Sequence, residues 1–344
     1  MLIMPSEALT FDDVLLVPQH STIKSRSSVD LSVKLPKGFS VNSPVVPANM
    51  RDVVSQQTAQ IFYDQGCLVV LHRFGSDHVE DQLNVLDSLN KRKESKLSIC
   101  CSIGTRVSEK SNVEVLIERG FNIVCIDVAH GDSISTLEMI EFISVRFPNV
   151  LLIAGNVATA EGAVRLWKAG ADIVKVGIGP GSICTTRKET GNGVPQMTAL
   201  SDVHDARLTL GKHLGRQLGI IADGGIRSSG DCVKALCFAD LVMIGGLFAS
   251  TVEAPGDLVT VDGRRFKKYS GSSTHKSNRI EGTIVLRPTN GDLKDVIQQL
   301  TEGIQSGCSY QNCHNVSDLK EDPVFVRVST GQQNLDQNKE TFRR

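Results

Sequence analysis

Eight short apolar runs, rich in valine and isoleucine, recur along the sequence, and segments with helical periodicity separate them. The runs are mostly apolar rather than alternating, a pattern typical of parallel strands covered by helices on one side and by a packed interior on the other. Eight strand–helix units predict a single-domain (β/α)8 barrel over residues 1–344, with a doubly wound sheet as the alternative. The predicted strands are residues 44–48, 67–72, 97–103, 123–127, 151–155, 172–176, 219–222 and 241–244.

Helices are expected between these strands and after the last one. A polar stretch after the eighth strand predicts a hairpin with Asp262 and Gly263 as its two-residue turn. The tail from Gln332 onward is expected to be mobile. The predicted helices are residues 55–63, 77–93, 112–119, 133–147, 159–169, 198–214, 229–238 and 292–304.

Composition excludes several classes of protein. The net charge of −1 provides no basic surface for nucleic acid or for an acidic membrane. No apolar run reaches the length of about 18 residues that a membrane-spanning helix needs, and the acidic N-terminal stretch does not resemble a signal peptide. Nine cysteines without paired metal or disulfide spacing predict a reduced, cytoplasmic protein.

The segment from Lys175 to Gln196 is the strongest functional signal. Gly177, Gly179 and Gly181 allow backbone N–H groups to converge on an anion, because no Cβ blocks a close approach. Cys184 follows as a candidate nucleophile, and the hydroxyl of Thr186 is placed to relay a proton. The alternative is a glycine-rich turn that contains an incidental buried cysteine.

Residues that follow the predicted strands are almost all polar or glycine. In a barrel these positions meet at one end, where active sites are built. The sequence therefore predicts a ring of ligand contacts there. The residues concerned are Asn49, His72, Arg73, Gly104, Thr105, Asp127, His130, Asn156, Asp223, Gly224, Gly225, Gly245 and Gly246.

The loop GIGPGSICTTR resembles the active-site loop of the IMP dehydrogenase/GMP reductase family. The segments LTFDDVLLVP, KSRS, PANM, IDVAHG, AGNV, ADGGIRSSGD, MIGG, EAPG and FVRV resemble the family in the same order. The resemblance implies the same barrel and a role in purine nucleotide metabolism and salvage. The chain runs from His72 through one helix into the third strand, which leaves no room for the CBS modules of many dehydrogenases.

The resemblance also implies a mechanism. Cys184 would attack C2 of the purine to form a thioimidate, and Thr186 would relay a proton with Glu281. The expected ligands are GMP and IMP, bound by a phosphate cradle and a ribose contact. The implied substrate-binding residues are Ser182, Asp223, Gly224, Gly225, Gly245, Gly246, Tyr269, Gly271, Ser272, Ser273, Arg279 and Gly282.

The resemblance implies NADPH as the cofactor, and the sequence has no GxGxxG motif that would indicate a Rossmann mode. It also implies a monovalent-cation site for K⁺ at Gly179, Gly181, Cys184 and Arg187, and a homotetramer. The implied cofactor-binding residues are Ser25, Arg26, Arg73, Asp127, Val128, Ala129, Asn156, Ile178, Gly179, Ser306, Gly307, Cys308 and Ser309.

The family has two branches, and the sequence favours the reductase. Dehydrogenases of the family hydrolyse the thioimidate with a long flap that carries an Arg-Tyr pair, whereas here only 11 residues, without a tyrosine, separate Tyr269 from Glu281. PANM, the Val-Ala after Asp127 and SGCSY also resemble the reductases. We therefore predict NADPH-dependent reductive deamination of GMP to IMP and ammonia.

Other features leave alternatives open. VPQ, EAPG and the KKY-G of the hairpin resemble the dehydrogenases, so an IMP dehydrogenase without CBS domains is the main alternative. Arg279 lies two positions before Glu281 rather than three, which weakens its assignment to the guanine. A purine-binding barrel without activity is a further alternative, which the intact set of Cys184, Thr186 and Glu281 disfavours.

Overall fold

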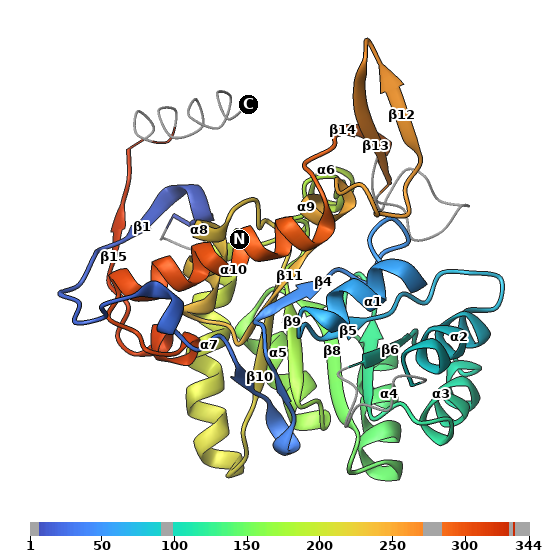
Figure 1. Cartoon of the computed structure of the whole chain (residues 1–344). Helices are drawn as coiled ribbons and strands as arrows, with labels where there is room; N and C mark the ends of the chain where they lie inside the picture. The colour runs from blue at the N-terminus through green and yellow to red at the C-terminus, as the bar shows by residue number, and fades with distance from the viewer. Residues whose placement is uncertain (1–6, 91–98, 271–283, 330–332, 334–344) are drawn as a thin grey trace.

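The computed structural model describes residues 7–90, 99–270, 284–329 and 333. Eight parallel strands form one sheet, and its two end strands lie next to each other, so that the sheet nearly closes into a barrel (Figure 1). This confirms the predicted (β/α)8 barrel in place of a doubly wound sheet. In spatial order the strands are β4 (Val45–Pro47), β11 (Leu241–Ile244), β10 (Gly219–Asp223), β9 (Ile173–Val176), β8 (Leu151–Val157), β7 (Ile123–Asp127), β6 (Ile99–Ile103) and β5 (Val69–Val70).

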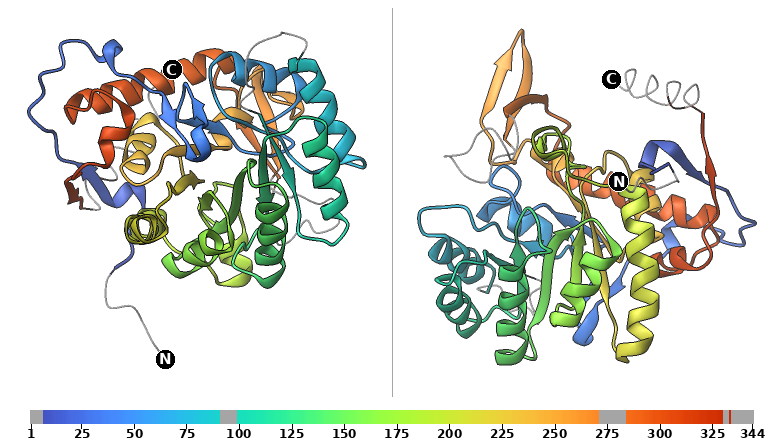
Figure 2. Two further views of the ribbon diagram at one scale, coloured as in Figure 1. Left: turned by 90° about the horizontal axis from the view of Figure 1, so that it is seen from below. Right: turned by 180° about the vertical axis from the view of Figure 1, so that it is seen from behind.

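Helices form the outer layer around these strands (Figure 2). The last of them, α10, packs against both α8 and α1 and so completes the ring. All eight predicted helices are present with shifted ends. They are α1 (Gln56–Asp64), α2 (His78–Asn90), α3 (Glu109–Glu118), α4 (Ile134–Arg146), α5 (Ala160–Ala169), α7 (Gln196–Leu214), α8 (Ser229–Leu236) and α10 (Leu293–Tyr310).

Local sequence explains where several helices begin. The hydroxyl oxygens of Thr159 and Ser228 each accept a hydrogen bond of 3.2 Å from the backbone N–H three residues later, which caps α5 and α8. The prediction for α10 ended too early. Gly307 lies inside this helix and packs against Val233 of α8, where a Cβ would come within 2.4 Å of a valine methyl group, so this glycine serves close helix packing rather than a helix end.

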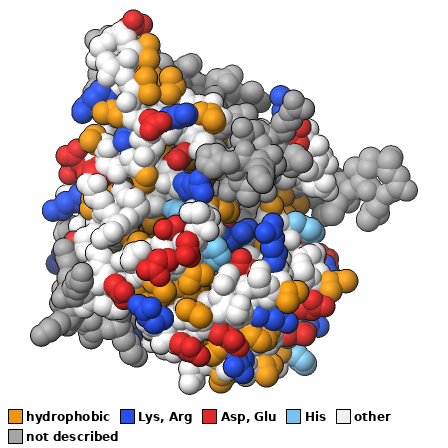
Figure 3. Space-filling view, turned by 90° about the vertical axis from the view of Figure 1, so that its right-hand side faces the viewer, with side chains coloured by type: hydrophobic (Ala, Val, Ile, Leu, Met, Phe, Trp, Pro, Cys, Tyr) orange, Lys and Arg blue, Asp and Glu red, His pale blue; other side chains and the backbone are white. Residues whose placement is uncertain are grey.

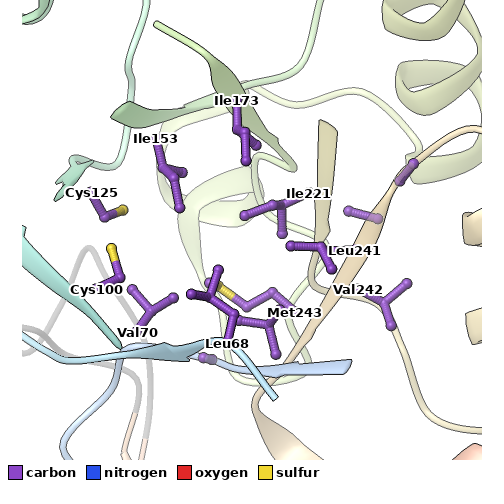
Figure 4. Close-up of a cluster of buried hydrophobic side chains, with 14 of the residues drawn as sticks. Leu68, Val70, Cys100, Cys125, Ile153, Ile173, Ile221, Leu241, Val242 and Met243 are labelled. Atoms are coloured by element: carbon purple, nitrogen blue, oxygen red, sulfur yellow. The ribbon is translucent and has the colours of Figure 1, made fainter. Parts of the chain in front are cut away.

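The barrel interior is filled by one apolar side chain from each of several successive strands (Figure 4). All of these side chains are essentially inaccessible to solvent. They are part of one apolar core that also extends between the strands and the outer helices, and burial of such side chains is the main favourable term in folding. They are Val70, Cys100, Cys125, Ile153, Ile173, Ile221 and Leu241.

A three-stranded antiparallel sheet projects from the end of the barrel at which the parallel strands terminate (Figure 1). Asp262 and Gly263 join its first two strands with φ of 48° and 72°, which confirms the predicted turn. Two short helices lie at the same end. These elements are β12 (Leu258–Val261), β13 (Arg264–Ser270), β14 (Ile284–Pro288), α6 (Thr186–Thr190) and α9 (Gly246–Ala249).

The two ends of the described chain meet, because β1 (Val14–Leu16) pairs antiparallel with β15 (Phe325–Arg327). A second small ladder joins β2 (Val33–Lys34) to β3 (Ser40–Val41). The tail from Gln332, expected to be mobile, lies outside the described residues apart from Gln333.

The surface agrees with the balanced composition. Acidic and basic side chains are interspersed over the face that Figure 3 shows. None of the helices in the described parts of the chain has the length and apolar character needed to cross a membrane.

Removal of the Phe62 ring should test the packing of α1 against α9. Phe62 is fully buried, and its ring meets that of Phe248 edge-on at 4.9 Å. Phe62→Ala should lower the free energy of unfolding by about 3–5 kcal/mol, as measured by urea denaturation. Val107→Ala, at a position 84% exposed, is the control and should change it by less than about 0.5 kcal/mol. Equal effects of the two substitutions would contradict this packing.

Candidate active site

A polar layer lies directly above the apolar interior at the carboxyl ends of the strands. Side chains two residues apart on a strand point the same way. On β7, β9 and β10, the buried Cys125, Ile173 and Ile221 are followed two positions later by Asp127, Lys175 and Asp223. The interior therefore changes from apolar to charged within one layer.

Lys175 joins the two aspartates of this layer. Its Nζ donates hydrogen bonds to Asp127 Oδ1 at 2.7 Å and to Asp223 Oδ2 at 3.3 Å. The amide of Asn156 also donates to Asp223 Oδ2, at 2.8 Å, and to the carbonyl oxygen of Gly177 at 2.8 Å. One polar network thus connects the four neighbouring strands β7, β8, β9 and β10 and the start of the loop after β9.

The network holds its members charged. Burial opposes ionisation of Asp127, but Lys175, with help from Arg73 and Asn49, keeps the pKa of this carboxyl below its ordinary value. Burial likewise opposes the charge on Lys175, and the carboxylates of Asp127 and Asp223 more than offset it, so its pKa is raised. A lysine that is 1% exposed thus remains a cation between two anions.

Cys184 lies in the loop after β9, half-buried and next to a hydroxyl. Its Sγ is 3.1 Å from Thr186 Oγ1, within hydrogen-bond distance for sulfur. Seven of the other eight cysteines are fully enclosed by the core or by packed helices, and their burial raises the pKa of each thiol. The predicted nucleophile and the predicted proton relay are therefore in direct contact.

Arg187 holds this loop in shape. Its Nε donates to the carbonyl oxygen of Ile178 at 3.1 Å, and its Nη2 donates to that of Val194 at 2.6 Å. Gly179 has φ of +80°, and a Cβ there would lie 2.4 Å from Arg187 Cγ. Glycine is thus required both by the backbone and by the packed arginine.

The carbonyl set proposed for K⁺ was Gly179, Gly181 and Cys184, together with Arg187. The Gly181 carbonyl oxygen already accepts a hydrogen bond of 3.0 Å from Cys184 N–H, which leaves one lone pair for a cation. No group of three His, Cys, Asp or Glu side chains within the described ranges is arranged to hold a metal ion. Backbone carbonyls suit a hard cation, and the site stays a prediction.

A cavity of about 550 Å³ opens beside the Cys184 loop, a size that suits a nucleotide. It contains many of the predicted substrate residues, which come from the ends of β9, β10 and β11 and from β13. The structure therefore places these residues around one space. They are Ser182, Asp223, Gly224, Gly225, Gly245, Gly246 and Tyr269.

Other predicted substrate residues and one predicted catalytic residue fall outside the described residues. Their assignment stays a prediction. They are Gly271, Ser272, Ser273, Arg279, Glu281 and Gly282.

The predicted cofactor residues fall into two groups. Arg73 donates from Nε to the Asp127 carbonyl oxygen at 3.0 Å, and Asn156 N–H donates to the Val128 carbonyl oxygen at 2.8 Å. Together with Ala129, Ile178 and Gly179, these residues lie at the barrel end. They offer a charged and amide-rich edge whose chemistry suits a nicotinamide and its carboxamide.

The second group lies on α10 and on the segment that packs against it, which includes Ser25 and Arg26. Ser306 and Ser309 are partly exposed, whereas Cys308 is fully buried and Gly307 packs against Val233. Within one chain, Gly307 and the Cys308 side chain therefore contribute to helix packing and do not line the cavity.

Sequence reasoning missed three residues of the site. Lys175 carried a signal, since a lysine inside an otherwise apolar strand needs a buried anion. Gln196 donates to the carbonyl oxygens of Val176 and Asp223 at 2.8 and 3.4 Å, and the sequence marked it only as the end of the Lys175–Gln196 segment, without a role. Arg287 of β14 also lines the cavity.

Comparisons with known proteins agree with this geometry. Residues 8–336 match the IMP dehydrogenase / GMP reductase domain. The chain is 36% identical to a GMP reductase of Streptococcus suis, over 93% of this chain and 95% of that protein. It is 37% identical to a GMP reductase of Lactobacillus gasseri, over 94% and 96%. It is also 34% identical to an inosine-5'-monophosphate dehydrogenase of Borreliella burgdorferi, over 94% of each chain.

Replacement of Lys175 should lower the stability of the protein, because Asp127 and Asp223 would lose the cation between them. Lys175→Met removes the cation and leaves two carboxylates near each other, which should lower the free energy of unfolding by about 3–5 kcal/mol at pH 7. The pKa of Asp127 is lower in the folded protein than in the unfolded chain. Its ionisation therefore stabilises the fold at a pH above the ordinary pKa of aspartate, and this stabilisation is lost as the pH falls through the lowered pKa. In the variant Asp127 lacks the cation that lowers its pKa, so this carboxyl protonates more readily.

The stability gap between wild type and Lys175→Met should therefore narrow as the pH falls from about 7 toward about 4. Denaturation midpoints across this range measure it. Lys168→Met, at an exposed position on α5, is the matched control and should show neither effect. A gap independent of pH would indicate that the role of Lys175 is packing rather than charge.

Proposed function

The chain belongs to the IMP dehydrogenase/GMP reductase family, and within it we propose that the protein is a GMP reductase that uses NADPH. The observation that carries this proposal is the contact of 3.1 Å between Cys184 Sγ and Thr186 Oγ1, beside a cavity of nucleotide size. A thiol paired with a hydroxyl can both attack an electrophilic carbon and move a proton to a leaving group. These are the two events that removal of an amine from a purine requires.

The proposed reaction proceeds in two steps. The Cys184 thiolate adds to C2 of guanine, and the C2–N bond breaks as the protonated 2-amino group leaves as ammonia. Hydride then adds to C2 of the thioimidate, and the C2–S bond breaks to release IMP and the thiolate. Overall, GMP, NADPH and two protons give IMP, NADP⁺ and ammonium.

Substrate orientation is assigned to the polar layer. One carboxylate oxygen of Asp223 is bound by Lys175 and Asn156, which leaves the other for the ribose hydroxyls. Ser182 and the glycine pairs line the cavity where the phosphate would lie. Thr186 is proposed to work with Glu281 on the departing amine.

NADPH, when bound, would supply the hydride. The residues that suit its nicotinamide end are Arg73, Asp127 and Asn156, because they place a cation and an amide at the edge of the barrel. The second group on α10 would require a neighbouring subunit to reach the same cofactor, in keeping with the proposed homotetramer. All nine cysteines are free, which supports the expectation of a reducing, cytoplasmic environment.

The reductase is favoured over the dehydrogenase because the chain lacks the flap that activates water in the dehydrogenases. A dehydrogenase must deliver activated water to C2, whereas only 11 residues without a tyrosine separate Tyr269 from Glu281 here. Dehydrogenase-like segments and the Borreliella burgdorferi relative make IMP oxidation to XMP with NAD the second candidate.

Cys184→Ala should reduce turnover to below a few per cent of wild type and leave nucleotide affinity within about twofold, since Asp223 and the glycine amides remain. Steady-state rates and calorimetric titration of GMP measure the two effects. Cys313→Ala removes a buried thiol outside the loop that follows β9 and serves as the control. Substantial turnover by Cys184→Ala would rule out the thioimidate.

The proposed function is tested by comparing the two substrate pairs on one enzyme preparation. With GMP the protein should oxidise NADPH, as followed by absorbance, and should release ammonia in equal amount. With IMP and NAD it should form little XMP. Robust XMP formation without GMP-dependent NADPH oxidation would overturn the reductase assignment and establish the second candidate.

A further inference from the structure

Arg287 is a cation that lines the substrate cavity from outside the barrel strands. It lies on β14, opposite Lys267 of β13 in the projecting sheet. Nothing in the sequence around it, VLRPTN, indicated a ligand contact. Its position in the cavity therefore comes from the fold of the projecting sheet over the barrel end.

The guanidinium of Arg287 faces the same small space as Ser182. A Cβ added to Gly246 would lie 3.3 Å from Arg287 Nη1 and 3.2 Å from Ser182 Oγ. The absence of a side chain at Gly246 leaves this point open. An anionic oxygen there would be within reach of a hydroxyl and a guanidinium together.

Tyr269 positions Arg287 from one side. The guanidinium carbon lies 5.8 Å from the centre of the Tyr269 ring, a cation–π arrangement. Tyr269 is 3% exposed, and its burial raises its pKa, so the phenol stays neutral. Its hydroxyl donates a hydrogen bond of 3.5 Å to Met50 Sδ and lies 2.7 Å from the point that a Cβ on Gly245 would occupy, so the ring is held in place at the edge of the cavity.

Toward the described residues, Arg287 keeps its charge unpaired, in contrast to the other arginines of the cavity. Arg187 donates to two loop carbonyls, and Arg227 pairs with Asp12 and Asp231. Within the described ranges, no carboxylate pairs with Arg287. Asp12 and Asp223 also line the cavity, but Asp12 pairs with Arg227 and Asp223 with Lys175, so both carboxylates are matched by other cations and the charge of Arg287 favours an anionic ligand.

We infer that Arg287 binds the 5′-phosphate of the nucleotide substrate and is the residue that makes this chain prefer a nucleotide over its nucleoside. The inference rests on the proposed function for the identity of the nucleotide. A planar guanidinium can give a phosphate two parallel hydrogen bonds, and the charge adds attraction that backbone amides alone lack. The residue thus adds a charged contact to a cradle of glycine amides and hydroxyls.

The test compares a ligand with a phosphate and a ligand without one. Calorimetry on the full chain, with inosine measured by displacement of IMP, gives affinities for both. Arg287→Gln should weaken IMP binding by about tenfold or more and inosine binding by less than about twofold. Arg287→Lys keeps the positive charge but loses the planar guanidinium with its paired N–H donors. This variant should therefore lose an intermediate amount of IMP affinity.

Arg264→Gln is the matched control. Arg264 is an exposed arginine on β13, next to the hairpin turn, and does not line the cavity. Its removal should change neither affinity, which separates a local contact from a general effect of net charge. In the reductase assay, Arg287→Gln should raise KM for GMP far more than it lowers kcat.

The possible results separate the role of Arg287 in phosphate binding from the proposed function of the protein. If wild type binds IMP and GMP but Arg287→Gln weakens IMP and inosine equally, Arg287 shapes the cavity and the phosphate assignment is wrong. If wild type binds neither nucleotide, the proposed function fails and the assignment fails with it. Selective loss of IMP affinity supports both.

Discussion

The buried contact of Lys175 with Asp127 and Asp223 is the interaction on which the rest of the site depends. A single ammonium group between two carboxylates fixes the relative positions of β7, β9 and β10 at their carboxyl ends. Each carboxylate also serves a second purpose, because Asp127 lies at the proposed cofactor edge and Asp223 at the proposed ribose contact. Any shift of one strand would leave a buried charge without its partner, which is costly.

The loop with the nucleophile begins two residues after Lys175, so the same network anchors it. Gly177 accepts a hydrogen bond from Asn156, and Arg187 then ties the two ends of the loop together through the carbonyls of Ile178 and Val194. Cys184 lies between these two fixed points. The contact of its sulfur with Thr186 is therefore a consequence of a rigid loop built on a charged layer.

Sequence patterns were sufficient for features that depend on neighbouring residues. Mostly apolar runs predicted all eight strands, Asp-Gly predicted the hairpin turn, and the spacing of Cys184 and Thr186 predicted their contact. Features that depend on distant residues were missed. Lys175 is satisfied by partners 48 residues away in either direction, and Arg287 reaches the cavity only because β14 folds over the barrel end.

The central claim is that the Cys184 adduct receives hydride rather than water, and isotopes test it most directly. GMP would be incubated with NADPH carrying deuterium at the transferred position, in water enriched in ¹⁸O, and the purine product would be analysed by mass spectrometry. The account predicts IMP with deuterium at C2 and no ¹⁸O. XMP carrying ¹⁸O at C2, or IMP without deuterium, would contradict it.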